Sequence, residues 1–182
     1  PLTTGGIRGG SKRLTKRFYP RTFNLGCRRA LFESLGGFDE TMRYGEDIDF
    51  SMRLYEAGSR VVLLPEAVLY HKRRVDLRKF YRQVWHSGTA RVELSRRHPG
   101  SMRLTYLLPT LFVVTTLVVT LLALWCPWFW LYHLLFIVSI FADALYRTHS
   151  MAVAWRAVVA SFVQLSGYGI GYLSQRVKRC KA

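Results

Sequence analysis

Acidic residues and cysteines are scarce in this sequence. The 182-residue chain contains 11 aspartates and glutamates against 27 lysines and arginines, and the only acid after residue 103 is Asp143. Its three cysteines, Cys27, Cys126 and Cys180, are far apart and form no Cys-x-x-Cys pair. This pattern argues against a disulfide framework and against a cysteine-based zinc site. The chain is strongly basic, and we expect neither a disulfide nor a cysteine-bound zinc to stabilise its fold.

Charge is also missing from a long stretch in the second half of the chain. Between residues 104 and 146 the ionisable side chains, apart from one cysteine and the tyrosines, are Asp143 and His133. A helix of about 20 mostly apolar residues is long enough to cross a bilayer. The sequence therefore predicts membrane-spanning helices over residues 105–125 and 128–146.

A third apolar segment, residues 151–173, contains Arg156 and Gln164. We expect it to be embedded in the membrane, and whether it crosses stays open. The turn between the first two segments carries no charge, whereas Arg103 and Arg147 flank their outer ends. Positive charge favours the cytoplasmic side, so the pattern predicts a multi-pass protein of the inner (plasma) membrane, with residues 1–103 in the cytoplasm.

The excess of basic residues has three interpretations. A high isoelectric point is typical of nucleic-acid binding, but the sequence has no zinc or RNA-binding motif and no basic helix with a groove-reading pattern. Anionic lipid head groups beside a membrane segment explain the charge more simply. An anionic substrate, such as the diphosphate of a nucleotide sugar, is the third interpretation. We predict membrane lipids as partners and no nucleic acid.

The first half of the chain has a mixed pattern of periodicities. An apolar stripe at Ile48, Met52 and Tyr55 is typical of a helix, and the β-branched run that follows is typical of a buried strand. Glycines mark the ends of two helices. The sequence predicts helices over residues 28–35, 46–57 and 76–97, with short strands over 61–64 and 67–70.

The motifs of the first half lie in a fixed order. Residues 24–31 read Asn-Leu-Gly-Cys-Arg-Arg-Ala-Leu, and residues 36–40 read Gly-Gly-Phe-Asp-Glu. Residues 45–54 read Gly-Glu-Asp-Ile-Asp-Phe-Ser-Met-Arg-Leu, and residues 65–71 read Pro-Glu-Ala-Val-Leu-Tyr-His. This succession resembles family 2 glycosyltransferases, over about residues 20–100.

The resemblance implies an α/β fold: an incomplete GT-A domain, its acceptor-side half, followed by an α-helical membrane region of two to three helices. The implied segments are the C-terminal part of the catalytic domain (1–75), an amphipathic interfacial helix (76–103), membrane helices (104–175) and a basic tail (176–182). The implied activity is inverting transfer of a sugar from a nucleotide-sugar donor to a hydroxyl of a glycan or lipid-linked acceptor, in cell-envelope polysaccharide synthesis.

The resemblance also implies roles for individual residues. Asp47 is the expected general base, which removes the acceptor proton, and Glu46 is expected to shape the acceptor side. His71 is the candidate ligand of a divalent metal, Mg or Mn. The predicted substrate-binding residues are Asn24, Arg29, Gly45, Asp49 and Arg53. Taken alone, acids in the first turn of a helix are common because the helix dipole favours them.

The family's donor-binding half, with its Asp-x-Asp metal motif, has no counterpart here. The chain also does not begin with methionine. We therefore expect a fragment that is inactive by itself. The alternative hypothesis is a non-catalytic, membrane-associated, transferase-like partner subunit.

Overall fold

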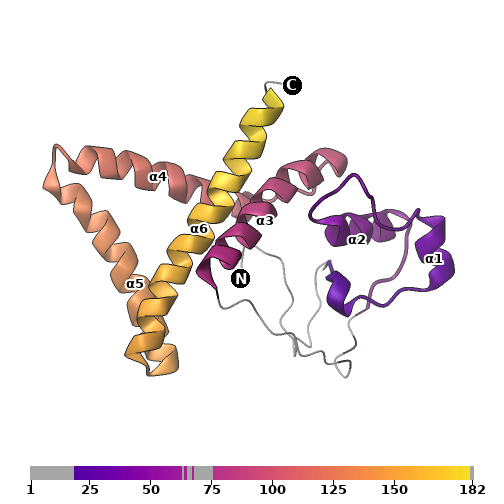
Figure 1. Cartoon of the computed structure of the whole chain (residues 1–182), viewed down its shortest axis with the longest axis horizontal. Coiled ribbons are helices and arrows are strands. Elements are labelled where there is room, and N and C mark those ends of the chain that lie inside the picture. Colours follow the sequence, from indigo (N-terminus) through magenta and orange to yellow (C-terminus); the bar gives the residue numbers. More distant parts are fainter. Residues whose placement is uncertain (1–18, 63, 65–66, 68–75, 181–182) are drawn as a thin grey trace. The chain divides into compact units, whose positions relative to one another are not determined.

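The structure is a computed structural model that describes residues 19–62, 64, 67 and 76–180. The chain divides into two compact units. The first comprises residues 1–73 and 90–102, and the second comprises residues 74–89 and 103–182. Helix α3 (Leu77–Arg97) contributes to both units, and the other helices belong to one unit each (Figure 1).

In the first unit, glycines set the ends of the short helices. The elements are η1 (Thr22–Asn24), α1 (Arg29–Ser34), α2 (Glu46–Glu56) and the last turns of α3. After α1, Gly36 and Gly37 adopt left-handed φ angles of 74° and 66°, which only glycine adopts readily. The three helices predicted over residues 28–35, 46–57 and 76–97 are confirmed to within one or two residues.

The core of the first unit forms on one face of α2. Ile48 and Met52 pack with Met42 and with Leu94 of α3, and Tyr19 covers this cluster. On another face of α2, Phe50 is completely buried and its ring centroid lies 5.2 Å from that of Phe32 and 5.4 Å from that of Phe38. The two clusters hold α2 on both sides, which fixes the residues of its first turn.

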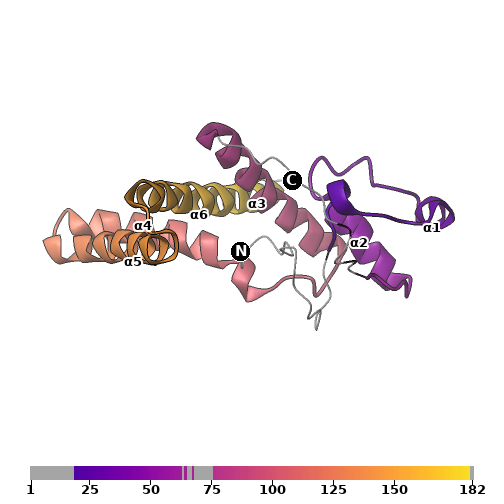
Figure 2. The same ribbon diagram turned by 90° about the horizontal axis from the view of Figure 1, so that it is seen from below.

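The second unit is built from helices with large apolar side chains. It contains the first turns of α3, η2 (Leu104–Tyr106), α4 (Leu108–Ala123), η3 (Pro127–Phe129), α5 (Trp130–Thr148) and α6 (Met151–Cys180). Helix α6 packs along both α4 and α5 (Figures 1 and 2). Phe112, Phe136 and Phe162, one from each of these helices, stack with ring centroids 4.8–5.9 Å apart.

A glycine allows the closest approach of α6 to α4. A Cβ added to Gly169 would collide with the carbonyl oxygen of Pro109 and would lie 2.7 Å from Cγ2 of Val113. Backbone and side chain of α4 both occupy this space, so a larger residue would push the helices apart. Two further glycines of α6 also lie close to neighbouring side chains or backbone, Gly167 to Val84 and Gly171 to Trp85, so the glycines of this stretch serve helix packing.

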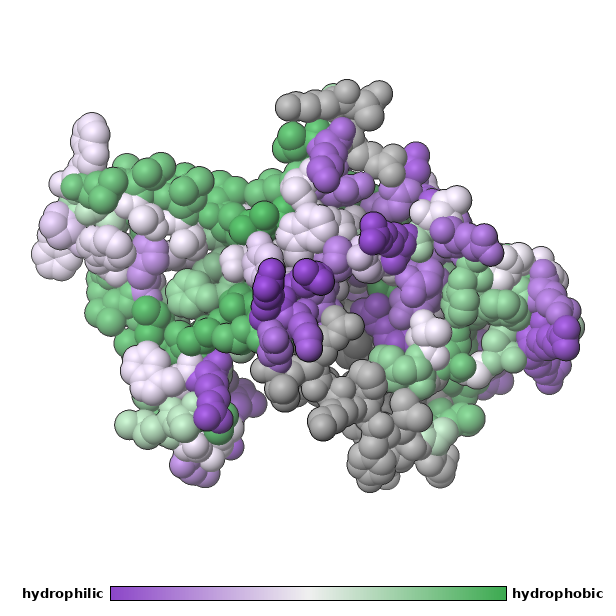
Figure 3. All heavy atoms as spheres, in the orientation of Figure 1, coloured by the Kyte–Doolittle hydropathy of each residue, from purple (hydrophilic) through white to green (hydrophobic). Residues whose placement is uncertain are grey.

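One helix in the described part of the chain is long and apolar enough to cross a membrane. It runs from Pro127 to Thr148, and only 6% of its apolar window is buried, so it is not a core helix. Helix α4 is equally apolar in character but shorter. Figure 3 shows hydrophobic side chains along the surface of α4 and α5.

Two parts of the predicted fold are wrong. The α/β class is overturned because the described residues form helices and no strand. In the expected strand 61–64, Val62 and Leu64 are 57% and 63% exposed and lack regular structure, so the run is not a buried strand. Residue 63 and most of the second expected strand, 67–70, lie outside the described residues.

The expected membrane region of two to three helices is also wrong, because one helix in the described part of the chain is long and apolar enough to cross a membrane. Prolines interrupt the long apolar run: Pro109 starts α4 and Pro127 starts the next segment. The 16 residues of α4 measure about 24 Å at 1.5 Å per residue, less than the ~30 Å hydrocarbon core. Helix α6 is long enough, but its charged and polar side chains lower its hydropathy.

Candidate functional site

The first turn of α2 is positioned by a glycine. Gly45 precedes the helix with a left-handed φ of 84°, and its carbonyl oxygen accepts the first helical hydrogen bond from the Asp49 N–H at 3.0 Å. A Cβ at this position would lie 3.2 Å from Cβ of Ala90. Backbone conformation and close packing therefore both require glycine immediately before the acidic residues.

Asp47 is buried at this helix start, with its side chain 12% exposed. Its Oδ1 accepts a hydrogen bond from the Ile48 N–H at 2.8 Å. The start of η1 makes longer contacts with the two oxygens of Asp47. Arg21 Nη1 lies 3.4 Å from Oδ1, and the Thr22 N–H lies 3.4 Å from Oδ2. At that distance N–H···O bonds are weak. The carboxylate is thus held in place while Oδ2 keeps capacity to accept a proton.

The backbone beneath Asp47 is also fixed. The Ser51 hydroxyl donates to the Asp47 carbonyl at 2.7 Å, and the Pro20 carbonyl lies 3.4 Å from the same hydroxyl. Ser51 is completely buried. Glu46 lies one residue before Asp47 and is half-buried.

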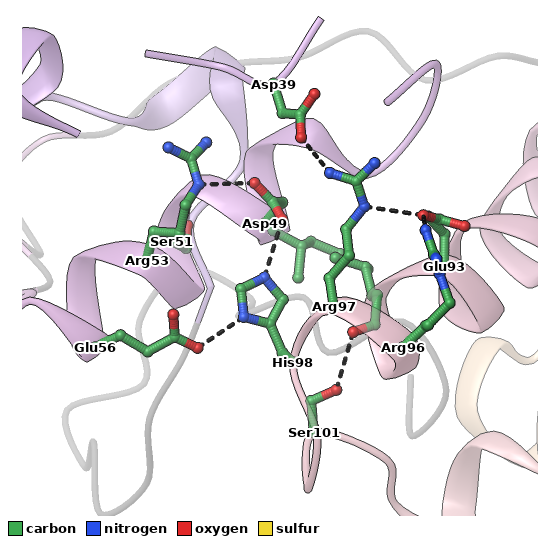
Figure 4. A network of polar contacts seen from close by, with 12 residues as sticks. Asp39, Asp49, Ser51, Arg53, Glu56, Glu93, Arg96, Arg97, His98 and Ser101 are labelled. Atoms are coloured by element: carbon green, nitrogen blue, oxygen red, sulfur yellow. Dashed lines mark hydrogen bonds and ion pairs between the residues drawn. The ribbon is translucent and has the colours of Figure 1, made fainter. Parts of the chain in front are cut away.

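A second carboxylate of α2 belongs to a chain of charged hydrogen bonds (Figure 4). Asp49 Oδ1 lies 2.9 Å from Nε2 of His98, and the other ring nitrogen, Nδ1, lies 2.7 Å from Oε1 of Glu56. The opposite oxygen of Asp49, Oδ2, accepts from Nε of Arg53 at 2.8 Å. The side chains of His98 and Asp49 are 8% and 4% exposed, so this part of the hydrogen-bond network is buried.

Arg53 extends this network of hydrogen bonds to the turn after α1. Its Nη1 donates to the Leu35 carbonyl at 2.5 Å, and its Nη2 donates to the Gly37 carbonyl at 2.7 Å. The fixed fork of a guanidinium suits this two-pronged contact. The Gly-Gly-Phe-Asp-Glu motif is therefore tied to the Glu-Asp motif by a single side chain.

A neighbouring network joins the end of α3 to the same motif (Figure 4). Arg97 pairs through Nη1 with Asp39 and through Nε with Glu93, the latter at 2.9 Å. Thr41 donates to Asp39 from both its hydroxyl and its N–H, at 2.6 Å and 2.8 Å. These two bonds, helped by Arg97, lower the pKa of Asp39 to about 2, while hydrogen bonding to Glu93 first, and then to Asp39, raises the pKa of Arg97.

The structure brings several predicted site residues together and leaves others apart. Gly45, Glu46, Asp47, Asp49 and Arg53 all lie on or next to α2. Arg29 lies on the surface of α1, where its Nε pairs with Glu33 at 2.7 Å. Asn24 ends η1. His71 lies outside the described residues. The roles assigned to all of these residues stay predictions.

No group of three potential metal ligands occurs among the described histidines, cysteines, aspartates and glutamates. The divalent metal, Mg or Mn, stays a prediction. Its predicted ligand, His71, lies outside the described residues.

Sequence reasoning missed His98, Glu56 and Arg21. The residues His98-Pro99-Gly100 by themselves indicate only the end of a helix. His98 lies 49 residues from Asp49 and 42 residues from Glu56 in the chain, so local periodicity gives no signal for their contact. A histidine at the end of a basic helix, in a chain short of acids, was the available hint.

Comparison with known protein families supports the motif-based resemblance. The model of "Glycosyl transferase family group 2" matches residues 12–163. The chain belongs to this family. The match takes in the whole first turn of α2 and continues through α5 into α6.

Curated relatives match a shorter stretch. The chain is similar to the "Pre-mycofactocin glycosyltransferase" of two Mycobacterium tuberculosis strains, CDC 1551 / Oshkosh and ATCC 25618 / H37Rv. In each case the identity is 43% over 74 residues, which is 40% of this chain and 16% of the relative. The chain therefore covers a small part of these relatives' length. No solved structure matches it significantly.

Proposed function

We propose that this chain contributes the acceptor-activating part of an inverting glycosyltransferase. Such an enzyme moves a sugar from a nucleotide-sugar donor to a hydroxyl of a glycan or lipid-linked acceptor, in the synthesis of cell-envelope polysaccharide. Membership of the family supports sugar transfer. The arrangement around Asp47 supports the position of the base, because a fixed, ionised carboxylate at a helix start is suited to proton abstraction.

The proposed step is a single displacement. Asp47 removes the proton from the acceptor hydroxyl while the acceptor oxygen forms its bond to the anomeric carbon. The bond from that carbon to the nucleoside diphosphate breaks, and the diphosphate leaves with the electron pair. The proton ends on Asp47, and the anomeric configuration inverts. Among the described residues Oδ2 has one hydrogen bond, the long one from Thr22, so it is the oxygen with capacity for this proton.

In this proposal Arg21 helps to hold the Asp47 carboxylate in place. Its guanidinium lies 3.4 Å from Oδ1 and is partly exposed. A divalent metal, Mg or Mn, would neutralise the diphosphate leaving group. We assign His71 as its candidate ligand and Glu46 to the acceptor side, as the motifs imply.

We further propose that the second unit attaches the enzyme to a membrane through α5. The observation that supports this is the exposure of its apolar side chains together with three tryptophans near the α4–α5 turn. Trp125, Trp128 and Trp130 are 90%, 81% and 50% exposed. Tryptophans of this kind gather at membrane–water interfaces. A membrane location fits a lipid-linked acceptor.

Replacing the proposed base tests the function. The protein, expressed from its native gene, is assayed in isolated membranes with a panel of radiolabelled nucleotide sugars. Asp47→Asn should remove sugar transfer, because an amide cannot take the proton. Asp143→Asn is the matched control: it removes an exposed carboxylate whose partner, Arg147, lies on the same helix of the second unit, and it should leave transfer intact. Product with retained anomeric configuration would contradict the single displacement. Normal transfer by Asp47→Asn would favour the non-catalytic partner subunit.

A further inference from the structure

The buried histidine at the end of α3 has no role in the step described above. His98 continues the last helical turn, since its N–H donates to the Leu94 carbonyl at 2.9 Å. Its ring is 8% exposed and has a carboxylate oxygen on each side, at 2.9 Å from Nε2 and at 2.7 Å from Nδ1. A buried ring that lies between two carboxylates is either incidental to the fold or a part of the site.

The two contacts of the ring restrict how it can be hydrogen bonded. An ionised carboxylate only accepts hydrogen bonds, and a neutral imidazole donates from one nitrogen only. Both contacts, to Asp49 and to Glu56, are hydrogen bonds only when both ring nitrogens carry hydrogen. His98 therefore fits this position as an imidazolium, between two acids that lie about two turns apart on α2.

The surrounding charges agree with a cation at this position. Arg53 pairs with the opposite oxygen of Asp49, and Arg97, next to His98 in the chain, is taken up by Asp39 and Glu93. Arg97 thus has carboxylates of its own, and the two acids that face the ring, Asp49 and Glu56, are left to His98 and Arg53. Charge-assisted hydrogen bonds of this kind are about twice as strong as neutral ones.

We propose that His98, as an imidazolium, is a positioning residue for the base Asp47. It clamps the end of α3 to α2 and locks Asp49, and Asp49 holds Arg53 on the turn after α1. The same rigid helix carries Asp47 two residues before Asp49, so its direction is set by this clamp. The inference rests on the proposed function, because it assigns His98 a role only through the base.

The proposal predicts a specific kinetic change. His98→Gln places an amide oxygen against one carboxylate and breaks the clamp, so kcat per folded enzyme should fall about tenfold or more, since small misplacements of a reacting group are costly. The KM values for donor and acceptor should stay within about twofold, because the interaction acts only on the chemical step. His98→Arg, which can donate to both acids, should recover part of kcat.

Milder variants guard against simple misfolding. Glu56→Gln removes the more exposed of the two acids, which is 59% exposed, and should lower kcat less than His98→Gln does. The double variant should be non-additive, as expected of residues in one network. Arg96→Gln is the control, since its exposed pair with Glu93 lies on the same helix and outside the clamp; it should leave kcat unchanged.

The experiment that decides the proposal combines these kinetics with nitrogen NMR of the membrane-reconstituted protein at neutral pH. The His98 signal, assigned among the five histidines by its loss in His98→Gln, should show hydrogen on both ring nitrogens. A neutral ring, or a kcat per folded enzyme that is unchanged in His98→Gln, would overturn the proposal. If instead Asp47→Asn retains turnover while the ring is doubly protonated, the assignment of the base fails and the His98–Asp49–Glu56 clamp itself stands.

Discussion

Large apolar side chains are placed oppositely in the two units. In the first unit Phe50 and Leu94 are 0% and 1% exposed, and charged side chains such as Asp49 and His98 lie buried beside them in pairs. In the second unit Trp125 and Trp128 are 90% and 81% exposed, and the acid of α5, Asp143, pairs with Arg147 on the surface. The first unit is thus organised around an interior. The second exposes large apolar side chains, which the proposed membrane attachment would cover.

The largest expected effect comes from truncating one apolar side chain in each unit. Phe50→Ala should destabilise α2 by about 3–5 kcal/mol, the usual effect of deleting a buried aromatic side chain. Leu134→Ala on α5, where the side chain is 55% exposed, should change local stability by less than about 0.5 kcal/mol. Hydrogen exchange of the α2 and α5 amides in the reconstituted protein measures both. Equal losses of protection in the two helices would remove the contrast.

A charge in the middle of α5 tests the assignment of its exposed surface. Val138→Arg, at a position 51% exposed, should cost about 2.5–3.5 kcal/mol if that surface lies in hydrocarbon. The fraction of protein that stays with membranes after an alkaline wash should then fall. Tyr146→Arg, near the end of the helix, is the matched control, because an arginine there can reach the interface. Equal retention of both variants would argue against a crossing by α5.

Sequence alone predicted the parts of the site that depend on local signals. Helix α2 follows from its apolar stripe and the acids of its first turn, and the motif around Gly45 and Asp47 indicated the family. The clamp was out of reach because its members, His98 and Asp49, are far apart in the chain. The prediction of a buried strand over residues 61–64 is wrong. β-branched residues indicate such a strand only where the side chains are buried, and Val62 and Leu64 are exposed.

The membrane region shows a similar limit. Composition alone predicts the number of membrane helices from the length of the whole apolar run. Two prolines divide this run, Pro109 and Pro127, and they set the lengths of the helices. The packing of α6 through Gly169 depends on contacts with α4 that no local pattern specifies. The sequence therefore identified apolar helices correctly and overestimated how many of them can cross.

The smallest expected effect concerns pH and the charged pairs of the first unit. The pKa of Asp39 is lowered to about 2 from 3.8, first by hydrogen bonds from Thr41 and then by Arg97. A carboxylate with a lowered pKa contributes stability above its unfolded value and loses that contribution as the pH falls through the folded value. The first unit should therefore lose some stability between about pH 4 and pH 2.

Thermal melts of the wild type and Asp39→Asn, followed by signals of the first unit across that pH range, measure this loss. The variant should be less stable at pH 5 and should lose less on acidification. Parallel acid dependence in the two proteins would show that the Asp39 contacts do not contribute.

The turnover of Asp47→Asn, at saturating donor and acceptor, tests the central claim most directly. General-base catalysis typically contributes about 10²–10⁴ in rate, so kcat should fall by that factor while donor binding, measured by equilibrium titration, is retained. A kcat within about threefold of the wild type, well below that contribution, would contradict the assignment of Asp47 as the base.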